Sequence, residues 1–505
     1  MSVFEPASYI ILLVVGAATL IVWLCMRPAN SPPGPPLKPL IGNALDFDPA
    51  APWTTFTKWK SRYGNIVGLR ALGNNIVVLN DLKTINDLFD KRSATYSCRP
   101  VFTVAKLMGL HDGIPLMPYG PRWRASRRLA HRALAPSAAS KYFQVQEQIS
   151  ALLVIDILTD PENLFKLVRM AAGRIMLSLT YGISVDKKDN EYFTQAETTL
   201  KLVCASSVPG AYLCDFLPIM KYLPSWVPFQ RTAARGKRMV EAFAASPFEK
   251  VKVDMGIVQA AGTAPPSLAQ DLLLNADESA DFIDHEHLVK WTAASMYGAG
   301  GETTYSAVLN FIMVMALYPE IQNRAFAEID SVLGPNRLPT VEDKPNLPYL
   351  DAVIKEMMRW MPILPLGVAR RATAKDSYNG YTIQEGTIIM PNVWYVASWC
   401  RAIAFEPNAK YPPETFNPER FLDSQHPATD PATWAFGICP GKYVGENSVF
   451  ILVATILHAL RISEDPGEPL VPHFATHLVR YPLPFKCRFE VRSKERIEML
   501  RGRSS

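Results

Sequence analysis

Hydrophobic residues recur at three- and four-residue intervals over much of the chain beyond residue 120, which is the spacing of one helix face. This pattern predicts helices over residues 122–135, 144–158, 284–318, 321–333, 349–360 and 441–460, many of them bounded by Pro or Gly. Two short apolar runs between residues 66 and 79, separated by Leu72-Gly-Asn-Asn75, predict a β-hairpin. We therefore expect a mainly α fold with minor β structure.

The N-terminal segment is apolar, and residues 6–26 carry no charged side chain. This length matches the roughly 20 residues that a helix needs to cross about 30 Å of hydrocarbon. We interpret residues 1–27 as a membrane anchor, with a cleaved signal peptide as the alternative. The run is longer than a typical signal core and is followed by Arg27 and Lys38, which predicts that the rest of the chain faces the cytosol.

Repeated prolines follow the predicted anchor. They fix φ and remove backbone donors over residues 28–43, which predicts a stiff tether. No fixed-period repeat or low-complexity linker divides residues 44–505, so we expect one large catalytic domain there.

Charge and cysteine content exclude some classes of function. The 52 Lys and Arg residues exceed the 47 Asp and Glu residues by only five over 505 residues, and no dense basic tract is interleaved with aromatic residues, so a nucleic-acid partner is not expected. The seven cysteines include no Cys-x-x-Cys pair, which argues against a Cys-ligated zinc site and a disulfide framework.

One cysteine has a setting that suits metal chemistry. Cys439 lies between a glycine-containing turn and a strongly helical run. A thiolate at a helix N-terminus is stabilised by free backbone N–H groups and the helix dipole, so this residue is a candidate ligand of iron. On this segment alone, a buried structural cysteine is the alternative reading.

The predicted helix over residues 284–318 contains the run Gly298-Ala-Gly-Gly-Glu-Thr-Thr304. Each glycine costs a helix interior about 1 kcal/mol relative to Ala, which indicates close approach of a ligand or a local opening of the helix. Glu302 and Thr303 follow directly, and a carboxylic acid and a hydroxyl can pass protons to a bound oxygen species. The alternative is a helix crossing that needs small residues for packing.

Glu356 and Arg359 form an i, i+3 pair, which is most often a surface pair worth a few tenths of a kcal/mol. Because Ile354, Met357 and Met358 surround them, the pair is also a candidate for burial. Arg420 could then complete a network in which two guanidinium groups share one carboxylate.

The order of these features along the chain is more specific than any one of them. An apolar N-terminal segment, a Pro-Pro-Gly-Pro stretch, Trp-x-x-x-Arg, Ala-Gly-x-Glu-Thr-Thr, Glu-x-x-Arg, Pro-Glu-Arg-Phe and a Cys-Pro-Gly loop follow one another. This order resembles that of the microsomal cytochrome P-450 haem-thiolate monooxygenases over nearly the whole chain, in the style of fungal enzymes of secondary metabolism. The resemblance implies the cytochrome P-450 fold, a large α-helical domain plus a small β-rich region, behind a single N-terminal transmembrane helix.

The resemblance also implies a haem b cofactor, with Cys439 as the proximal thiolate ligand of its iron. Trp123, Arg127 and Arg370 match positions that hydrogen-bond the haem propionates. The further positions implied to bind the cofactor are Phe436 and Gly441 of the haem loop.

Roles in catalysis, in support and in electron transfer follow from the same resemblance. Glu302 and Thr303 match the acid and alcohol pair that delivers protons to oxygen, with Glu in place of the commoner Asp. The residues that match a structural network on the proximal side are Glu356, Arg359 and Arg420. The residues that could form a basic face for NADPH–cytochrome P-450 reductase, or simply a solvated basic face, are Arg124, Arg128, Arg132 and Lys442.

The chain departs from the family in its haem loop, which is usually similar to Phe-x-x-Gly-x-Arg-x-Cys-x-Gly. Here Phe436 lies three residues before Cys439 instead of seven, and the Arg and Gly of the pattern are replaced by Gly437 and Ala435. Their loss threatens haem affinity and shielding of the sulfur. A second departure is an insertion over residues 398–404. Misplaced exon boundaries explain both departures better than a degenerate haem site, because the distant motifs are intact; the degenerate site stays the alternative.

The leading hypothesis is a monooxygenase of the endoplasmic reticulum membrane that inserts one oxygen atom from O2 into a lipophilic, terpenoid-like small molecule. A catalytically impaired or haem-deficient membrane-anchored remnant is the alternative, since the loop before Cys439 is shortened. A haem-thiolate isomerase or dehydratase is a third, against which the Glu302–Thr303 pair argues. By resemblance, the pocket walls come from residues 101–116, 204–229, 293–299, 363–368 and 476–481, which are mostly apolar.

Overall fold

The computed structural model describes residues 30–39, 41–48, 51–100, 102–184, 191–207, 212–215, 217–258, 266–275, 284–394, 410–425, 428–433, 439–475 and 478–504. The chain divides into two compact units. Residues 1–100, 216–218 and 366–396 form the sheet unit, and residues 101–215, 219–365 and 397–505 form the helical unit. The predicted anchor, residues 1–27, lies outside the described residues, and the single catalytic domain over residues 44–505 stays a prediction.

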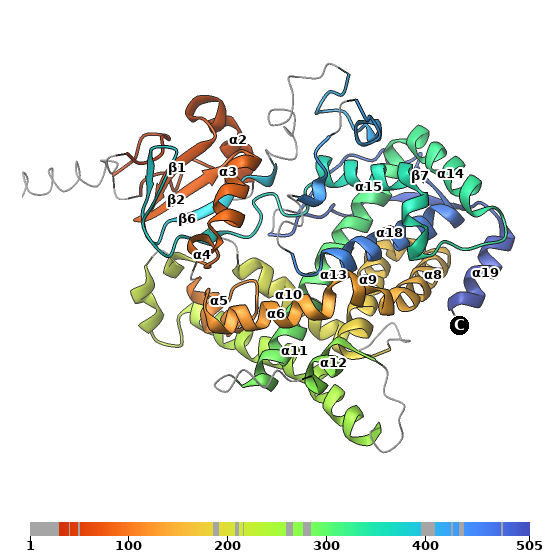
Figure 1. The fold of residues 1–505 in the computed structure, drawn as a ribbon, viewed down its shortest axis with the longest axis horizontal. Coiled ribbons are helices and arrows are strands. Elements are labelled where there is room, and N and C mark those ends of the chain that lie inside the picture. Colours follow the sequence, from red (N-terminus) through yellow and green to blue (C-terminus); the bar gives the residue numbers. More distant parts are fainter. Residues whose placement is uncertain are drawn as a thin grey trace, which may run out of the picture. The chain divides into compact units, whose positions relative to one another are not determined.

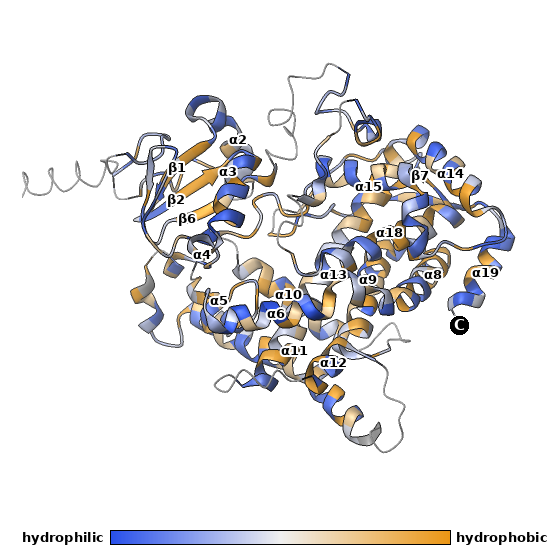
Figure 2. Cartoon of the chain, in the orientation of Figure 1, coloured by the Kyte–Doolittle hydropathy of each residue, from blue (hydrophilic) through white to orange (hydrophobic). Residues whose placement is uncertain are grey.

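The sheet unit is built on a four-stranded sheet with strand order β1-β2-β6-β3 (Figure 1). Its strands are β1 (Ile66–Ala71), β2 (Asn74–Leu79), β3 (Arg370–Arg371) and β6 (Ile388–Pro391), with a separate pair β4 (Asp376–Tyr378) and β5 (Tyr381–Ile383), and its helices are α2 (Pro52–Tyr63), α3 (Leu82–Asn86) and α4 (Ser93–Tyr96). Strands β1 and β2 are antiparallel, whereas β2 and β6 are parallel. Figure 2 shows that β1, β2 and β6 are strongly hydrophobic, as expected of strands covered on their faces.

The predicted hairpin is confirmed. Ile66 pairs with Leu79 at one end of the ladder and Ala71 pairs with Asn74 at the other. Leu72 and Gly73 both have positive φ, at 45° and 88°, which is the backbone of the two-residue turn that suits the twist of a hairpin. The turn therefore occupies Leu72-Gly73, and the two asparagines that follow already belong to β2.

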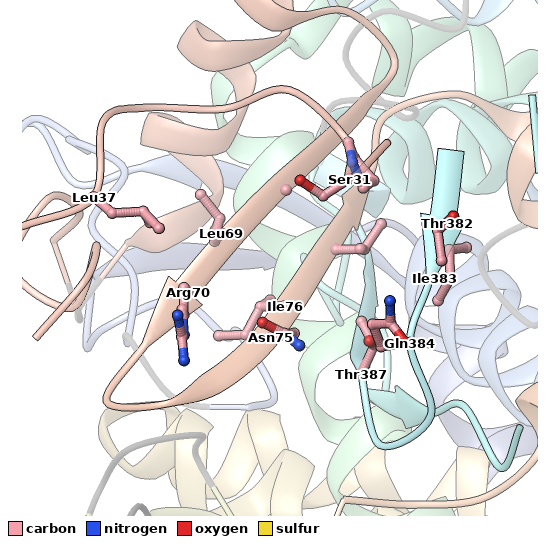
Figure 3. Close-up of a pocket in the computed structure, with 13 residues that line it drawn as sticks. Ser31, Leu37, Leu69, Arg70, Asn75, Ile76, Thr382, Ile383, Gln384 and Thr387 are labelled. Atoms are coloured by element: carbon pink, nitrogen blue, oxygen red, sulfur yellow. The ribbon is translucent and has the colours of Figure 1, made fainter. Parts of the chain in front are cut away.

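The described part of the predicted tether, residues 30–39 and 41–43, lies against this sheet. Gly68 N–H donates to the Pro33 carbonyl at 2.7 Å, and Asn43 Nδ2 donates to the Pro36 carbonyl at 3.0 Å. A shallow groove runs between this stretch, β1, β2 and the turn after β5. Figure 3 shows Leu37, Leu69 and Arg70 on one side of it and Thr382, Ile383, Gln384 and Thr387 on the other. None of the described groove residues is a predicted site residue.

The helical unit contains the long helices (Figure 1). Its helices are α5 (Thr103–Leu107), α6 (Pro121–Leu134), α7 (Pro136–Ala139), α8 (Phe143–Thr159), α9 (Leu164–Tyr181), α10 (Glu191–Ser206), α11 (Pro228–Val258), α12 (Leu268–Leu274), α13 (His285–Leu317), α14 (Pro319–Leu333), α15 (Pro348–Trp360), α18 (Lys442–Ala459) and α19 (Lys494–Ser504), and its strands are β7 (Leu460–Glu464) and β8 (Cys487–Val491). Helix α13 lies along α9 and contributes fully buried residues such as Val308, Phe311 and Ile312 to one continuous core.

All six helices predicted from periodicity are present, within two residues at each end, as α6, α8, α13, α14, α15 and α18. Several helices were not predicted from the sequence pattern, and the longest of them are α9 and α11. Helix α9 is buried on nearly all sides, so it lacks the polar face on which the prediction depends. Helix α11 continues through Pro247, where a break is the usual expectation.

None of the helices in the described ranges is by itself both long and apolar enough to span a bilayer. Helices α13 and α14 meet that requirement only as a pair, and they are bent by 108° at the break between them. Most of α13 is buried inside the helical unit.

Candidate functional site

Cys439 lies three residues before the first residue of α18, and Gly441 is the residue that caps this helix. The side chain of Cys439 is exposed. A Cβ atom added at Gly441 would stand 3.9 Å from the Cys439 sulfur. That separation is an ordinary van der Waals contact, so Gly441 lies directly beside the sulfur.

Burial and helix geometry act on this thiol in opposite directions. Desolvation is the largest cause of a raised pKa, while the backbone N–H of Gly441 and the charge of Arg127 lower it. The net shift of the thiol pKa is upward. A bound metal ion would convert the thiol to a thiolate.

Trp123 and Arg127 lie on α6 close to Cys439. The Arg127 guanidinium interacts electrostatically with the Cys439 sulfur, and it lies 5.6 Å from the centre of the Trp123 ring. Burial lowers the pKa of Arg127. The Trp123 Nε1–H is buried and finds no acceptor among the described residues. A buried donor without an acceptor is costly, so this position suits an acidic group of a bound molecule.

The donor set around Cys439 fits a haem. A thiol that can ligate iron, a guanidinium that can pair with a propionate and a buried indole N–H without an acceptor all belong to the same end of the helical unit. Phe436, and with it the whole segment 434–438 before the cysteine, lies outside the described residues.

Arg370 belongs to the sheet unit, on strand β3. Its guanidinium lies 4.1 Å from the centre of the Phe89 ring, and Nη1 donates to the Tyr96 carbonyl at 3.5 Å. The structure therefore describes the contacts of Arg370 within the sheet unit.

The residues predicted to form a basic face are placed on the helical unit. Arg124, Arg128 and Arg132 are exposed on α6, and Lys442 is partly exposed at the first position of α18. Arg132 donates to the Asn275 carbonyl at 2.7 Å. Their exposure is compatible with both alternatives, a docking surface and a solvated face.

The glycines of α13 serve mainly for packing, and the helix is continuous through them. A Cβ atom at Gly300 would meet the Met176 side chain of α9 at 2.5 Å, and one at Gly298 would meet Leu200 of α10 at 3.1 Å. Of the three glycines Gly298, Gly300 and Gly301, the last is the one that faces open space. The predicted local opening of the helix is therefore wrong for the backbone, and close packing explains two of the three glycines.

Glu302 of α13 is held by Arg169 of α9. Arg169 Nη1 donates to Glu302 Oε1, and the two side chains are only 12% and 13% exposed. Burial raises the pKa of Glu302, Arg169 lowers it, and the charge of Glu197 adds a further rise, so that the net shift is upward. The motif contains Glu302, but nothing in the sequence pattern pointed to Arg169.

Thr303 points in another direction from its neighbour. Its Oγ1 donates to the Ala299 carbonyl at 2.8 Å, one turn earlier on α13. Side chains at consecutive helix positions do not face each other. The Glu302 carboxylate and the Thr303 hydroxyl are therefore not in direct contact. A proton moving from Glu302 to Thr303 needs a change of the Glu302 side chain or an intervening water molecule.

Glu356, Arg359 and Arg420 form the predicted network, and burial of all three favours this reading over a surface pair. Glu356 is fully buried, and its two oxygens accept from Arg359 Nε at 2.7 Å and Nη2 at 2.8 Å. Arg420 Nε pairs with Glu356 Oε2 at 2.9 Å. Both guanidinium groups also donate to the Thr415 carbonyl.

Comparison with known proteins decides the family. Residues 32–489 match the family model described as Cytochrome P450. The chain belongs to the cytochrome P450 family. Cytochrome P450 monooxygenase 98 of Postia placenta is 34% identical over 508 residues, covering 96% of this chain and 95% of the relative. Cytochrome P450 monooxygenase claR of Ampulloclitocybe clavipes is 34% identical, over 94% of this chain and 89% of the relative.

A third relative is cytochrome P450 monooxygenase COX2 of Coprinopsis cinerea, which is 35% identical over 92% of this chain and 90% of its own length. The cytochrome P450 chain described here is accordingly an oxidoreductase of the monooxygenase type, similar to fungal members. Membership implies a haem bound through a cysteine thiolate, O2, a redox partner and a lipophilic substrate.

Proposed function

We propose that this chain uses a haem held by Cys439 to insert one oxygen atom from O2 into a lipophilic small molecule, as a hydroxylation step in the synthesis of a terpenoid-like secondary metabolite. The observation that carries the proposal is the Cys439 setting. An exposed thiol at the start of α18, the adjacent Arg127 charge and the buried Trp123 Nε1–H without an acceptor are the groups that iron and an acidic cofactor edge require.

Several residues of the helical unit would each bind a different part of the haem. Cys439 would ligate iron through sulfur, the Gly441 backbone N–H would approach that sulfur, and Trp123 with Arg127 would bind a propionate. Phe436 would belong to the loop around the sulfur, and Arg370 stays a predicted propionate partner. The haem, when bound, supplies the redox chemistry that activates O2.

The protein's own acid and hydroxyl would then move protons. Glu302 is a carboxyl whose pKa is raised by burial, which places it closer to neutral pH, where a general acid works best. The Thr303 hydroxyl donates to the Ala299 carbonyl, so its oxygen lone pairs remain able to accept a hydrogen bond from Glu302 or from water.

The substrate class is argued from the apolar walls of the predicted pocket. Ala293, Ala294, Met296 and Tyr297 of α13 are buried and mostly hydrophobic. Such walls suit a terpenoid-like scaffold that offers few polar groups. Electrons would come from NADPH–cytochrome P-450 reductase, docked on the basic face of α6.

We further propose that the chain is a single-pass protein of the endoplasmic reticulum membrane with its catalytic part in the cytosol. The charge-free stretch over residues 6–26 and the positive residues after it support this localisation. Membrane attachment would also place the enzyme where lipophilic substrates accumulate.

The second candidate function is a haem-deficient, membrane-anchored remnant, which the shortened loop before Cys439 favours. The reduced carbon monoxide difference spectrum separates the two. We expect the chain as written, produced in microsomes, to show the Soret band of a thiolate-ligated haem, Cys439→Ser to lose it, and Cys98→Ser to keep it.

A chain with the four missing loop residues restored is the reference for this experiment. If only the restored chain shows the band, the sequence as written encodes a remnant and the proposal is wrong. If the band is present, incubation with terpenoid hydrocarbons under 18O2 should place one labelled oxygen atom in the product, and products without label would contradict the monooxygenase reaction.

A further inference from the structure

One face of α13 contacts the loop formed by residues 109–117, which lies between α5 and α6. His287, Trp291 and Ser295 follow one another at intervals of four residues, so they lie on the same face of the helix. The His287 and Trp291 rings are 6.2 Å apart between centres. Ser295 and most of the 109–117 loop fall within the ranges predicted to line the substrate pocket. The contact between them therefore matters for the shape of that pocket.

Ser295 joins the helix and the loop through its hydroxyl group. Its Oγ donates to the Trp291 carbonyl at 2.7 Å and accepts from the Ile114 N–H at 3.0 Å. A Cβ atom added at Gly113 would stand 3.4 Å from the same oxygen, so the loop backbone passes close to it. Ser295 and Ile114 are both buried. Because a buried N–H without an acceptor is costly, the Ile114 backbone is held where the Ser295 oxygen lies.

The 109–117 loop has little regular structure of its own. It contains one short 3-10 turn, Leu110–Asp112, and a second turn in which the Met117 N–H donates to the Gly113 carbonyl at 2.9 Å. The Ile114 N–H takes part in neither turn, and its acceptor is Ser295 Oγ. A loop of this kind depends on contacts with its neighbours for a fixed position. The bond to Ser295 is such a contact, and it lies in the middle of the loop.

Asp112 provides a second contact between the loop and its surroundings. Its Oδ1 accepts from Arg122 Nη2 at 3.0 Å, at the start of α6, and lies 3.7 Å from His287 Nε2 of α13. The Asp112 side chain is 18% exposed, so this contact is nearer to solvent than the one at Ser295. Because the contact at Asp112 does not involve Ser295, we expect removal of the Ser295 hydroxyl to loosen the loop without releasing it.

We propose that Ser295 is a positioning residue for substrate binding: by accepting from the Ile114 N–H, it fixes the wall that the 109–117 loop forms in the substrate pocket. This inference rests on the proposed function, because the pocket belongs to the monooxygenase site assigned there. The hydroxyl hydrogen of Ser295 is already used for the Trp291 carbonyl. Ser295 therefore offers the substrate no donor and acts through the loop, which agrees with a lipophilic substrate.

The first experiment measures hydrogen–deuterium exchange of the Ile114 amide in the full chain in detergent. Ser295→Ala removes the acceptor, so we expect this amide to exchange about tenfold faster. Ser295→Thr keeps a hydroxyl oxygen at the position and should restore the slow exchange. Ser295→Cys fills a similar space with a weaker acceptor and should give a smaller acceleration. This last variant tests the inference even if Ser295→Ala does not fold.

Thr292→Val is the matched control. Thr292 is a fully buried residue of the same helix, and its Oγ1 has no hydrogen-bond partner among the residues that the structure describes. The variant therefore removes a buried hydroxyl of α13 without touching the bond to the loop, and exchange of the Ile114 amide should stay unchanged. An amide that exchanges equally slowly in Ser295→Ala and in the unmodified chain, or that Thr292→Val accelerates equally, overturns the inference.

The second experiment measures the binding of two azoles to the holoenzyme from the shift of the Soret band. Imidazole binds the haem iron and is too small to reach far into the pocket, whereas 4-phenylimidazole also places an apolar ring there. We expect Ser295→Ala to weaken 4-phenylimidazole binding several-fold and to leave imidazole binding unchanged, and Ser295→Thr to restore the affinity. Unchanged binding of 4-phenylimidazole, or equal weakening of both azoles, counts against a role of Ser295 in shaping the pocket.

The two experiments separate this inference from the proposed function. Exchange of the Ile114 amide reports on the contact between the loop and α13, whatever the state of the haem. Loss of the carbon monoxide spectrum in the unmodified chain would contradict the proposed function. Unaltered exchange in Ser295→Ala beside a normal spectrum would contradict the role of Ser295 alone.

Discussion

Two buried carboxylates of the helical unit, Glu356 on α15 and Glu302 on α13, both pair with arginine and yet have different surroundings. Glu356 is fully buried, and its oxygens meet Arg359, Arg420 and the backbone N–H of Asn417, which donates at 2.8 Å. Glu302 is slightly exposed, and one of its oxygens accepts a hydrogen bond from Arg169. It also borders a pocket that reaches solvent.

The difference shows which carboxylate can take part in chemistry. An acid whose acceptor positions are all filled by fixed donors has no place for a proton and no route for one to arrive, so Glu356 stabilises structure. An acid with one fixed donor and access to a pocket can exchange a proton, so Glu302 can serve as a general acid. Burial alone does not separate the two; saturation of the hydrogen bonds does.

The largest effect is expected at the saturated carboxylate. Glu356→Gln leaves two buried guanidinium groups without a counter-charge, which should lower the free energy of unfolding by about 3–5 kcal/mol. Urea unfolding of the full chain in detergent measures this. Glu498→Gln is the matched control, because Glu498 and Arg501 have the same i, i+3 spacing on a surface where both are more than half exposed, and it should cost at most about 0.5 kcal/mol. Equal losses of unfolding free energy in the two variants would contradict the difference between the buried network and a surface ion pair.

At the unsaturated carboxylate we expect a smaller loss of stability and a larger loss of function. Glu302→Gln keeps Arg169 over its tyrosine rings and near Glu197, so the free energy of unfolding should fall by about 1–2 kcal/mol. Coupling of NADPH consumption to product should fall about tenfold, which is within the range of general acid catalysis. A stability loss as large as that of Glu356→Gln would show that the two sites do not differ.

The pH dependence of stability sharpens the comparison, because the pKa of folded Glu302 lies above its usual value of 4.5. The folded state then binds this proton more tightly than the unfolded state, so the stability that Glu302 contributes is greatest at low pH. It declines as the pH rises from 4.5 through the folded pKa. The free energy of unfolding of the unmodified chain minus that of Glu302→Gln should therefore decrease between pH 5 and pH 8. An increase of this difference over the same pH range would contradict the upward shift of the Glu302 pKa.

The sequence was a good guide to the elements and motifs that are local. Helices α6, α13, α15 and α18 have an apolar pattern or Pro and Gly at their ends, and the Glu356–Arg359 pair was recognisable from its spacing and apolar neighbours. Partners that only tertiary structure brings together were missed. Arg169 is 133 positions from Glu302, and the parallel pairing of β2 with β6 joins Ile76 to Ile388.

The electrostatic environment of the site residues could not be predicted from the sequence either. The helix start favours ionisation of Cys439, and surrounding atoms that no motif encodes act on the pKa of the thiol in the opposite direction. The sequence likewise showed that the glycines of α13 are unusual in a helix interior. Only the packing of Met176 against Gly300 shows the reason, which is the close approach of a neighbouring helix. Local patterns predict which residues matter, while the balance of burial and charge depends on distant segments.

The smallest effect is expected from the aromatic wall behind Arg169. Tyr481→Leu keeps an apolar side chain but removes the ring that lies 5.8 Å from the guanidinium, at the outer limit of a cation–π contact, so the free energy of unfolding should fall by only about 0.5–1 kcal/mol. The nearer ring of Tyr305, at 3.9 Å, makes Tyr305→Leu the more damaging of the two. Because both rings hold the charge that pairs with Glu302, each variant should also shift the pH midpoint at which the infrared band of the Glu302 carboxylic acid disappears, in the same rank order. Equivalent substitutions around Arg420, such as Tyr411→Leu, should leave that midpoint unchanged, since Glu356 and not Glu302 is the acid paired with Arg420.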